Sequence, residues 1–340
     1  MDSSIIKFLR FPLIVGIVAI HAYHLDISFN PQLSIFNHIQ YFFSQMLGRI
    51  SVPLFFFFSG YLFFYKKDTF NKEIYLKQVK KRFWSLFIPY IFWISLYILF
   101  ISLFDHNTFS AYYKDGFTLT TFLKSYWNLI SGSMPLLYPL WFLRDLMILC
   151  ILTPLIYLLV KKVKLLLIFI LLVWWYLDIF NYPGFRSISV LFFVSGAYLS
   201  INKLSFSALI RKVPLSILLP LCIFFVGFDL YYSIINSTIN KTCILILIVV
   251  VLRISIASLD RFEINKVLLT LSSSSFFVYI VHEPVLNFAR SYLAGIMVPI
   301  KYTIYYFSCI LLTLIISVAA YLLLKKIAPR ALNFVLGNRN

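Results

Sequence analysis

Long apolar blocks alternate with short polar intervals along almost the whole chain. The blocks contain roughly 17 to 22 residues, which is the length that an α-helix needs to cross the hydrocarbon core of a bilayer. The pattern therefore predicts an all-α, polytopic membrane bundle of about ten transmembrane helices. The predicted spans are residues 5–25, 50–65, 84–104, 139–160, 164–181, 187–201, 214–233, 242–259, 268–289 and 303–324. The polar intervals leave no room for a soluble domain, so residues 1–340 are expected to form a single integral-membrane domain.

The composition agrees with a bilayer environment. Hydrophobic residues make up 61% of the chain and charged residues only 12%, where a soluble domain carries about a quarter charged residues. The cysteines lie singly inside apolar blocks, without the paired spacing of a metal site or a disulfide framework. We therefore expect buried thiols and no metal.

The net charge of +18 first suggests a nucleic-acid partner. Its distribution argues against one, because 22 of the 30 lysines and arginines fall in alternate intervals, beginning with the amino-terminal one. This alternation is what the positive-inside rule predicts. The basic charge is therefore a topology signal that puts both termini in the cytoplasm, and the expected partner is the lipid bilayer, with no nucleic acid.

Two intervals between spans are long. Segment 105–138 is expected outside, is polar and aromatic, and is predicted to contain a short surface helix at 119–130. It suits either a platform on which a ligand binds or an interfacial aromatic belt. Segment 66–83 is expected inside, is cationic and is predicted to be helical. It suits either anchoring to anionic headgroups or binding of a phosphorylated cytosolic ligand.

Ionisable side chains inside the predicted spans are functional candidates, because a charge in the hydrocarbon region is costly unless it is paired. Those singled out here are Arg10, His21, His24, Arg144, Asp145, His282 and Glu283. A transmembrane histidine also serves simply to hydrogen-bond across a helix interface. The adjacent Arg144 and Asp145 are consistent with a local structural ion pair.

Arg10 and His21 are predicted to share one helix face. They are eleven residues apart, so their directions differ by about 20° at 100° per residue. His282 lies about as far into an inside-to-outside span as His21 does, which predicts that the two histidines share a depth in the membrane. If their spans are neighbours, both rings face one cavity.

The stretches 52–64 and 190–200 each contain a phenylalanine-rich run followed by Ser-Gly. Small residues among bulky aromatics let another backbone or a ligand approach closely. Helix packing is the favoured interpretation of Ser59 and Gly60, and a ligand-lining role is the alternative.

In this order along the chain, the motifs resemble those of the acyltransferase 3 family of bacterial membrane-bound acyltransferases. The matching features are Arg10 and His21 in the first span, Pro53 to Tyr61, Lys80-Lys81-Arg82 through Pro89-Tyr90, Trp141-Phe142-Leu143, Ser272 to Ser275, and Tyr279 to Pro284. Each motif is weak alone, but together they extend over nearly the whole chain. One departure is Ser85, which stands where the family often has a second arginine after Arg82.

The resemblance implies transfer of an acyl group, most commonly acetyl, from cytosolic acetyl-coenzyme A to a hydroxyl of a cell-surface or exported polysaccharide. It implies that His21 is the catalytic base or a transiently acylated group, that His282 assists it, and that Arg10, Lys80, Lys81 and Arg82 bind the coenzyme A phosphates. Ser59, Gly60, Trp141 and Glu283 would line the site. The expected location is the bacterial inner membrane, with acyl-coenzyme A on its cytoplasmic side and a glycan or other hydroxyl acceptor.

Two other classes of function stay open at this point. A polysaccharide or lipid-linked glycan flippase would use the same intramembrane charges without any acyl-transfer chemistry. An accessory subunit of a glycan-synthesis complex would not depend on Arg10, His21 or His282. Binding or hydrolysis of acetyl-coenzyme A separates the enzyme from the flippase.

Overall fold

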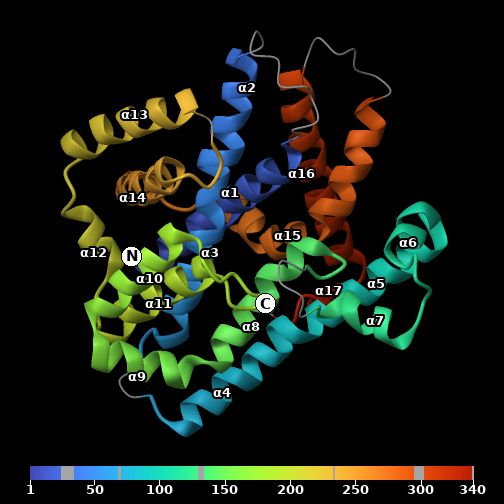
Figure 1. Ribbon diagram of the computed structural model, residues 1–340, viewed down its shortest axis with the longest axis horizontal. Coiled ribbons are helices and arrows are strands. Elements are labelled where there is room, and N and C mark those ends of the chain that lie inside the picture. Colours follow the sequence, from blue (N-terminus) through green and yellow to red (C-terminus); the bar gives the residue numbers. More distant parts are fainter. Residues whose placement is uncertain (24–33, 68–69, 129–133, 233, 295–301, 339–340) are drawn as a thin grey trace. The chain divides into compact units, whose positions relative to one another are not determined.

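The computed structural model describes residues 1–23, 34–67, 70–128, 134–232, 234–294 and 302–338 (Figure 1). Within these ranges the regular structure is helical and forms no named strand, which confirms the predicted all-α class. The residues divide into two compact units. Unit 1 is residues 1–55 and 203–326, and unit 2 is residues 56–202 and 327–340. That the whole chain acts as one domain stays a prediction.

Unit 1 contains the long helices that carry both histidines. Its elements are α1 (Asp2–Ala22), α2 (Ser34–Tyr41), the π-helical η2 (Phe42–Leu47), the 3-10 turn η3 (Gly48–Ile50), the start of α3 (Ser51–Phe64), α12 (Phe206–Arg211), α13 (Leu215–Tyr232), α14 (Thr238–Arg261), α15 (Lys266–Ala294) and α16 (Tyr302–Ile327). Part of its core joins Val18, Ala19 and Ala22 of α1 to Leu286 of α15 and to Tyr306, Cys309 and Ile310 of α16. This apolar packing holds the last turn of α1 beside the middle of α15.

Unit 2 contains the remaining elements. They are the rest of α3, α4 (Lys72–Arg82), the π-helical η4 (Phe83–Phe87), α5 (Ile88–Phe104), α6 (His106–Tyr112), α7 (Leu119–Tyr126), the 3-10 turn η5 (Tyr138–Leu140), α8 (Trp141–Ile151), α9 (Thr153–Val163), α10 (Leu165–Leu177), α11 (Ser187–Ile201) and α17 (Pro329–Val335). Figure 1 shows α4 and α5 as one continuous rod, which extends over 33 residues. The predicted helices in 66–83 and near 119–130 are confirmed as α4 and α7.

Six helices in the described residues are long and apolar enough to cross a membrane. They are Asp2–Ala22, Asn37–Phe64, Lys72–Phe104, Leu215–Tyr232, Thr238–Arg261 and Thr303–Ile327. A seventh crossing results if Tyr138–Ile151 and Thr153–Val163, which meet at a 66° bend, form one broken span. Within the described residues each of the ten predicted spans overlaps helix, although α10 covers only Leu165–Leu177 of the predicted span 164–181. Helices α10 and α11 are short, and serines, His282 and Glu283 make α15 less apolar. The count of ten and the cytoplasmic termini stay predictions.

The second membrane helix begins well before the predicted span at residue 50. A continuous helix runs from Asn37 to Phe64, although its first half contains polar residues. Gln40, Ser44 and Gln45 are buried there, and they recur at near-helical spacing on one face. Because they lower the local hydropathy, the sequence pattern assigns this half to an outside interval.

Candidate active site

The predicted histidine pair lies together in unit 1. His21 is in the last turn of α1 and is half-buried, whereas His282 is in the middle of α15 and fully buried. Their ring centroids are 5.2 Å apart and the ring planes differ by 38°. The two helices are therefore neighbours at the histidines, and His21 is the more accessible of the two. That both rings face one cavity stays a prediction.

The orientation of His282 is fixed by its own helix. Its Nδ1 lies 2.6 Å from the main-chain carbonyl oxygen of Tyr279. Because a carbonyl oxygen only accepts, Nδ1 carries the proton in the neutral ring and Nε2 presents a lone pair. Nε2 is buried without a hydrogen-bond partner among the described residues. The site therefore holds a preoriented hydrogen-bond acceptor next to His21.

A second contact joins the two histidine-bearing helices. Arg290, two turns after His282 on α15, donates through Nη2 to the main-chain carbonyl oxygen of His21. Its Nη1 donates to Asn287 at 2.9 Å and lies 3.9 Å from a carboxylate oxygen of Glu283. Glu283 is thus buried in this group, and its role in lining the site stays a prediction. Tyr306 also donates to the carbonyl oxygen of Ala19 at 3.1 Å.

Two arginines place positive charge near His21. Arg290 reaches the carbonyl oxygen of His21, and Arg49 directly follows Gly48, whose backbone packs against Gly16 and Ile20 of α1. The sequence interpretation missed both, because it counted them only as cations of outside intervals. Arg49 could have been found from its spacing, because Gln40, Ser44, Gln45 and Arg49 form one polar helix face in an otherwise apolar stretch.

The residues predicted to bind coenzyme A fall in different units. Arg10 is exposed on α1, eleven residues before His21, and Lys80 and Lys81 are exposed at the end of α4. Arg82 is half-buried, and its Nε has no hydrogen-bond partner in the described parts of the chain. The three α4 cations belong to unit 2 and Arg10 to unit 1.

Lys67 belongs with the α4 cations and was not predicted. Its ammonium group donates to the carbonyl oxygen of Phe63, and burial, followed by the charges of Arg82 and Lys81, lowers the pKa of Lys67 to about 8. A lysine held among like charges gains from an anionic ligand that neutralises them. Lys67, Lys81 and Arg82 therefore form a cationic cluster suited to phosphate.

The Ser-Gly pairs are packing positions within unit 2. A Cβ atom added to Gly60 would collide with the backbone of Phe193, and one added to Gly196 would collide with the backbone of Phe57. The two glycines thus let α3 and α11 approach at backbone distance. This supports the packing interpretation of Gly60, and Ser59 next to it is half-buried.

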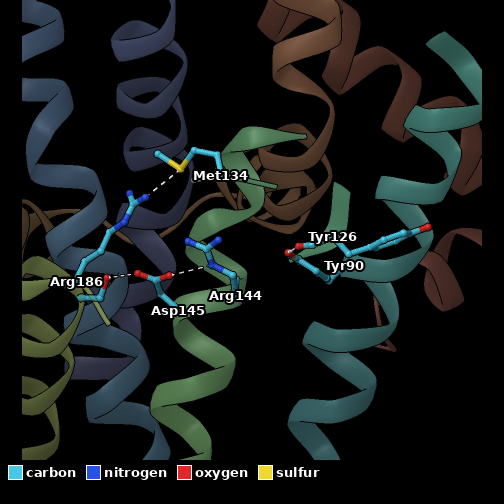
Figure 2. Close-up of polar contacts among 7 residues, drawn as sticks. Tyr90, Tyr126, Met134, Arg144, Asp145 and Arg186 are labelled. Atoms are coloured by element: carbon cyan, nitrogen blue, oxygen red, sulfur yellow. Dashed lines mark hydrogen bonds and ion pairs between the residues drawn. The ribbon is translucent and has the colours of Figure 1, made fainter. Parts of the chain in front are cut away.

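Trp141 belongs to a polar cluster of unit 2. The guanidinium of Arg186 stacks on its ring at 4.3 Å. The same guanidinium donates to the sulfur of Met134 at 3.0 Å (Figure 2). The buried carboxylate of Asp145 lies 3.5 Å from Nε of Arg144 and accepts from Ser189 at 2.9 Å. The predicted local pair of Arg144 and Asp145 is confirmed, and Arg186 is an addition that the sequence interpretation missed.

The predicted outer segment is held together by tyrosines. Tyr113 after α6 and Ser125 of α7 are hydrogen-bonded through their hydroxyls at 2.7 Å. Tyr90 of α5 donates to the carbonyl oxygen of Tyr126, as Figure 2 also shows. Burial raises the pKa of Tyr113, so its hydroxyl stays protonated. The bond from Tyr90 attaches the end of α7 near the middle of the α4–α5 rod, and the bond between Tyr113 and Ser125 joins α6 to α7.

Comparisons with known proteins connect this arrangement to a reaction. A family model described as an acyltransferase domain matches residues 4–322. The chain is also 26% identical, over 367 aligned positions, to the succinoglycan biosynthesis protein ExoH of Rhizobium meliloti (strain 1021), covering 100% of this chain and 94% of that protein. No solved structure matches the chain significantly. In the described residues no group of three metal-ligating side chains is assembled.

Proposed function

Because the chain belongs to the acyltransferase 3 family, we propose that it transfers an acyl group, acetyl in the first instance, from acyl-coenzyme A to a polysaccharide hydroxyl. The family and the multiple apolar helices support a multi-pass membrane enzyme. Polysaccharide as acceptor is supported by the similarity to a succinoglycan biosynthesis protein. The proposal puts the donor on the cytoplasmic side of a bacterial inner membrane, with ten crossings and both termini cytoplasmic.

The observation that carries this proposal is the contact between His21 and His282. An alcohol must lose its proton as it attacks a carbonyl carbon, and an imidazole is suited to accept it near neutral pH. His21 is the accessible ring, so we assign it the role of general base. His282, buried behind it with Nε2 as an acceptor, orients His21 or takes up its proton.

The reaction then proceeds in a balanced sequence. The acceptor hydroxyl gives its proton to His21 while its oxygen forms a bond to the thioester carbon. The tetrahedral intermediate collapses, the carbon–sulfur bond breaks, and the coenzyme A thiolate takes the proton back from the imidazolium. The products are a polysaccharide ester and free coenzyme A. General-base catalysis supplies about 10²–10⁴-fold, and holding both substrates in line supplies much of the remainder.

The donor phosphates need cations near the cytoplasmic surface. We propose that Arg10, Lys80, Lys81 and Arg82 supply them, joined by Lys67. Lys67 would compensate for the missing second arginine after Arg82, because it supplies a positive charge nearby. Unlike arginine, it cannot form a bidentate contact with a phosphate. Arg186 and Trp141 form a stacked platform in unit 2 of the kind that binds sugars and acidic groups, and we assign it to the acceptor.

The test uses purified protein in lipid vesicles, acetyl-coenzyme A, and lipid-linked glycan extracted from the cells that make the protein. Release of free coenzyme A thiol that depends on the glycan supports the enzyme. His21→Ala should lose this release, whereas His38→Ala, which removes a half-buried histidine elsewhere in unit 1, should retain it. A wild-type protein that releases no thiol but moves labelled glycan across the vesicle membrane would instead be a flippase.

A further inference from the structure

Arg49 lies near the middle of a membrane helix, where a charge is costly unless it is paired. The helix runs from Asn37 to Phe64, and the side chain is half-buried. The turns before it are irregular, with π-helical η2 followed directly by the 3-10 turn η3 that contains Arg49. Such interruptions of a helix are frequent at functional sites. They set the direction of Arg49 independently of the regular helix after it.

A close helix crossing brings Arg49 next to the histidine-bearing turn of α1. A Cβ atom on Gly48 would lie 2.8 Å from the carbonyl oxygen of Gly16 and 2.9 Å from a side-chain carbon of Ile20. Only glycine fits there, so the backbone of residue 48 touches the turn that leads into His21. Arg49 is the next residue, so its side chain begins at this contact with the turn that leads into His21.

A chain of buried polar groups holds Arg49 from behind. Its Nε donates to Oε1 of Gln45 at 2.9 Å. The main-chain oxygen of Gln45 accepts from the amide of Asn240 at 3.2 Å, and the same amide donates to Asp229 at 2.8 Å. Tyr41 contacts the other carboxylate oxygen of Asp229 at 3.4 Å. Asp229 and Asn240 are fully buried, so this support is rigid.

Arg49 differs from Arg290, the other cation beside His21, in what its terminal nitrogens do. Both terminal nitrogens of Arg290 are engaged, with Asn287, Glu283 and the carbonyl oxygen of His21. In the described parts of the chain, Arg49 has a recorded hydrogen bond only through Nε and no direct ion pair. A guanidinium kept in an apolar helix without a carboxylate partner costs several kcal/mol, roughly, which favours a functional role.

We propose that Arg49 is a further catalytic residue, whose terminal nitrogens bind the thioester carbonyl oxygen and stabilise its negative charge in the tetrahedral intermediate. The inference rests on the proposed acyl transfer. When the hydroxyl oxygen bonds to the carbonyl carbon, the carbon–oxygen π electrons move to the carbonyl oxygen, and they return as the thiolate leaves. Arg49 makes and breaks no covalent bond. It is a preoriented donor for charge that develops only during the reaction.

The test compares acyl transfer by the purified wild-type protein with that of three arginine variants in the same vesicles. Arg49→Gln keeps the size of the side chain and should lower kcat by about 10²–10³-fold, the typical effect of removing an oxyanion donor. The KM for acetyl-coenzyme A should change less than threefold, since the phosphates supply most of the ground-state affinity and the contact with Arg49 strengthens only as charge develops on the carbonyl oxygen. The kcat of Arg49→Lys should lie between those of the wild type and Arg49→Gln, because an ammonium cannot bind Gln45 and the substrate oxygen at the same time. Arg211→Ala, which removes an exposed arginine of α12, is the control and should keep wild-type kcat.

Guanidinium chloride added to Arg49→Ala at millimolar concentration should restore part of kcat, and sodium chloride at equal ionic strength should not. A wild-type protein without transfer defeats the proposed function itself. With an active wild type, an Arg49→Gln kcat within threefold of normal overturns the role of Arg49, as does a loss confined to KM. If Arg49→Gln does not fold, an Arg49→Lys protein with wild-type Tm and kcat within twofold of wild type overturns it equally.

Discussion

The side chain of Arg290 caps the turn that carries His21, because it donates to the main-chain carbonyl oxygen of that residue from the neighbouring helix α15. The carbonyl groups in the last turn of a helix lack intrahelical partners, and a cation there also complements the helix dipole. The same helix carries His282. One arginine therefore fixes the backbone of one histidine relative to the side chain of the other.

Arg290→Ala should consequently loosen both the fold and the site. A hydrogen bond that involves a charged group contributes about 1.5–3 kcal/mol, so the variant should have a lower Tm and a lower kcat. Arg211→Ala is the matched control, since its ion pair with Asp260 is 2.6 Å long but largely exposed. Such surface pairs contribute about 0–1 kcal/mol. Equal Tm losses in the two variants would argue against a structural role for the Arg290 contact.

The histidine pair predicts unequal effects of its two members. His21→Ala should reduce kcat by about 10²–10⁴-fold, as expected for loss of a general base. His282→Gln retains a polar side chain in a fully buried position and should leave more activity than His21→Ala. The measurement is kcat for coenzyme A release. A His21→Ala protein with normal Tm and near-normal turnover would remove His21 from the mechanism.

These two histidines show how far sequence reasoning reaches. The alternation of charge gave the spans their directions, and the directions predicted a shared depth for His21 and His282, which the 5.2 Å ring contact agrees with. Apolar blocks and helix length likewise predicted the all-α fold, because both follow from local composition.

What the sequence could not provide is the pairing of distant polar groups. Arg49, Gln45 and Asn240 lower the hydropathy of their surroundings, so the pattern treats Arg49 as part of an outside interval. Their arrangement depends on long-range contacts such as the hydrogen bond from the amide of Asn240 to the carbonyl oxygen of Gln45, which join residues 195 positions apart in the chain. Arg290 and Arg186 were missed for the same reason, since a cation near a helix end is normally a solvated residue.

The glycines of α3 and α11 predict a sharp contrast in tolerance to alanine. Gly60→Ala and Gly196→Ala each push a methyl group into the backbone of the facing helix, and such overpacking costs about 1–3 kcal/mol. Gly227→Ala adds its methyl group in open space, and alanine is the better helix former there. Thermal unfolding in detergent should therefore give a lower Tm for the first two variants only. A drop for Gly227→Ala of the same size would refute the packing role.

Lys67 predicts a pH dependence of donor binding. Its pKa of about 8 lies below the usual 10.5, so the side chain is charged below pH 8 and becomes neutral above it. Since the charged form attracts phosphate, the KM for acetyl-coenzyme A should rise between pH 7.5 and about 9, the range in which such a group titrates. Lys67→Arg should flatten this rise, because arginine keeps its charge.

Lys77→Gln, which removes an exposed lysine of α4, is the control for Lys67 and should leave the pH profile of KM unchanged.

Raising the pH has opposite effects on stability and on donor binding, since it stabilises the fold and weakens the binding of phosphate by Lys67. A lysine whose pKa is lower in the folded protein binds fewer protons there than in the unfolded chain, so folding becomes more favourable as pH rises through 8 toward 10.5. A KM that is independent of pH would exclude Lys67 from the donor site.

We propose that the protein transfers an acyl group to a polysaccharide, with His21 as the general base and His282 supporting it. The most direct test is the mass of the polysaccharide repeating unit from cells that lack the protein and are complemented with either wild-type or His21→Ala protein at equal membrane levels. We expect the repeating unit from wild-type cells to be heavier by one acyl group, acetyl in the first instance. The repeating unit from His21→Ala cells should match that of cells without the protein. Repeats of identical mass in all three would contradict it.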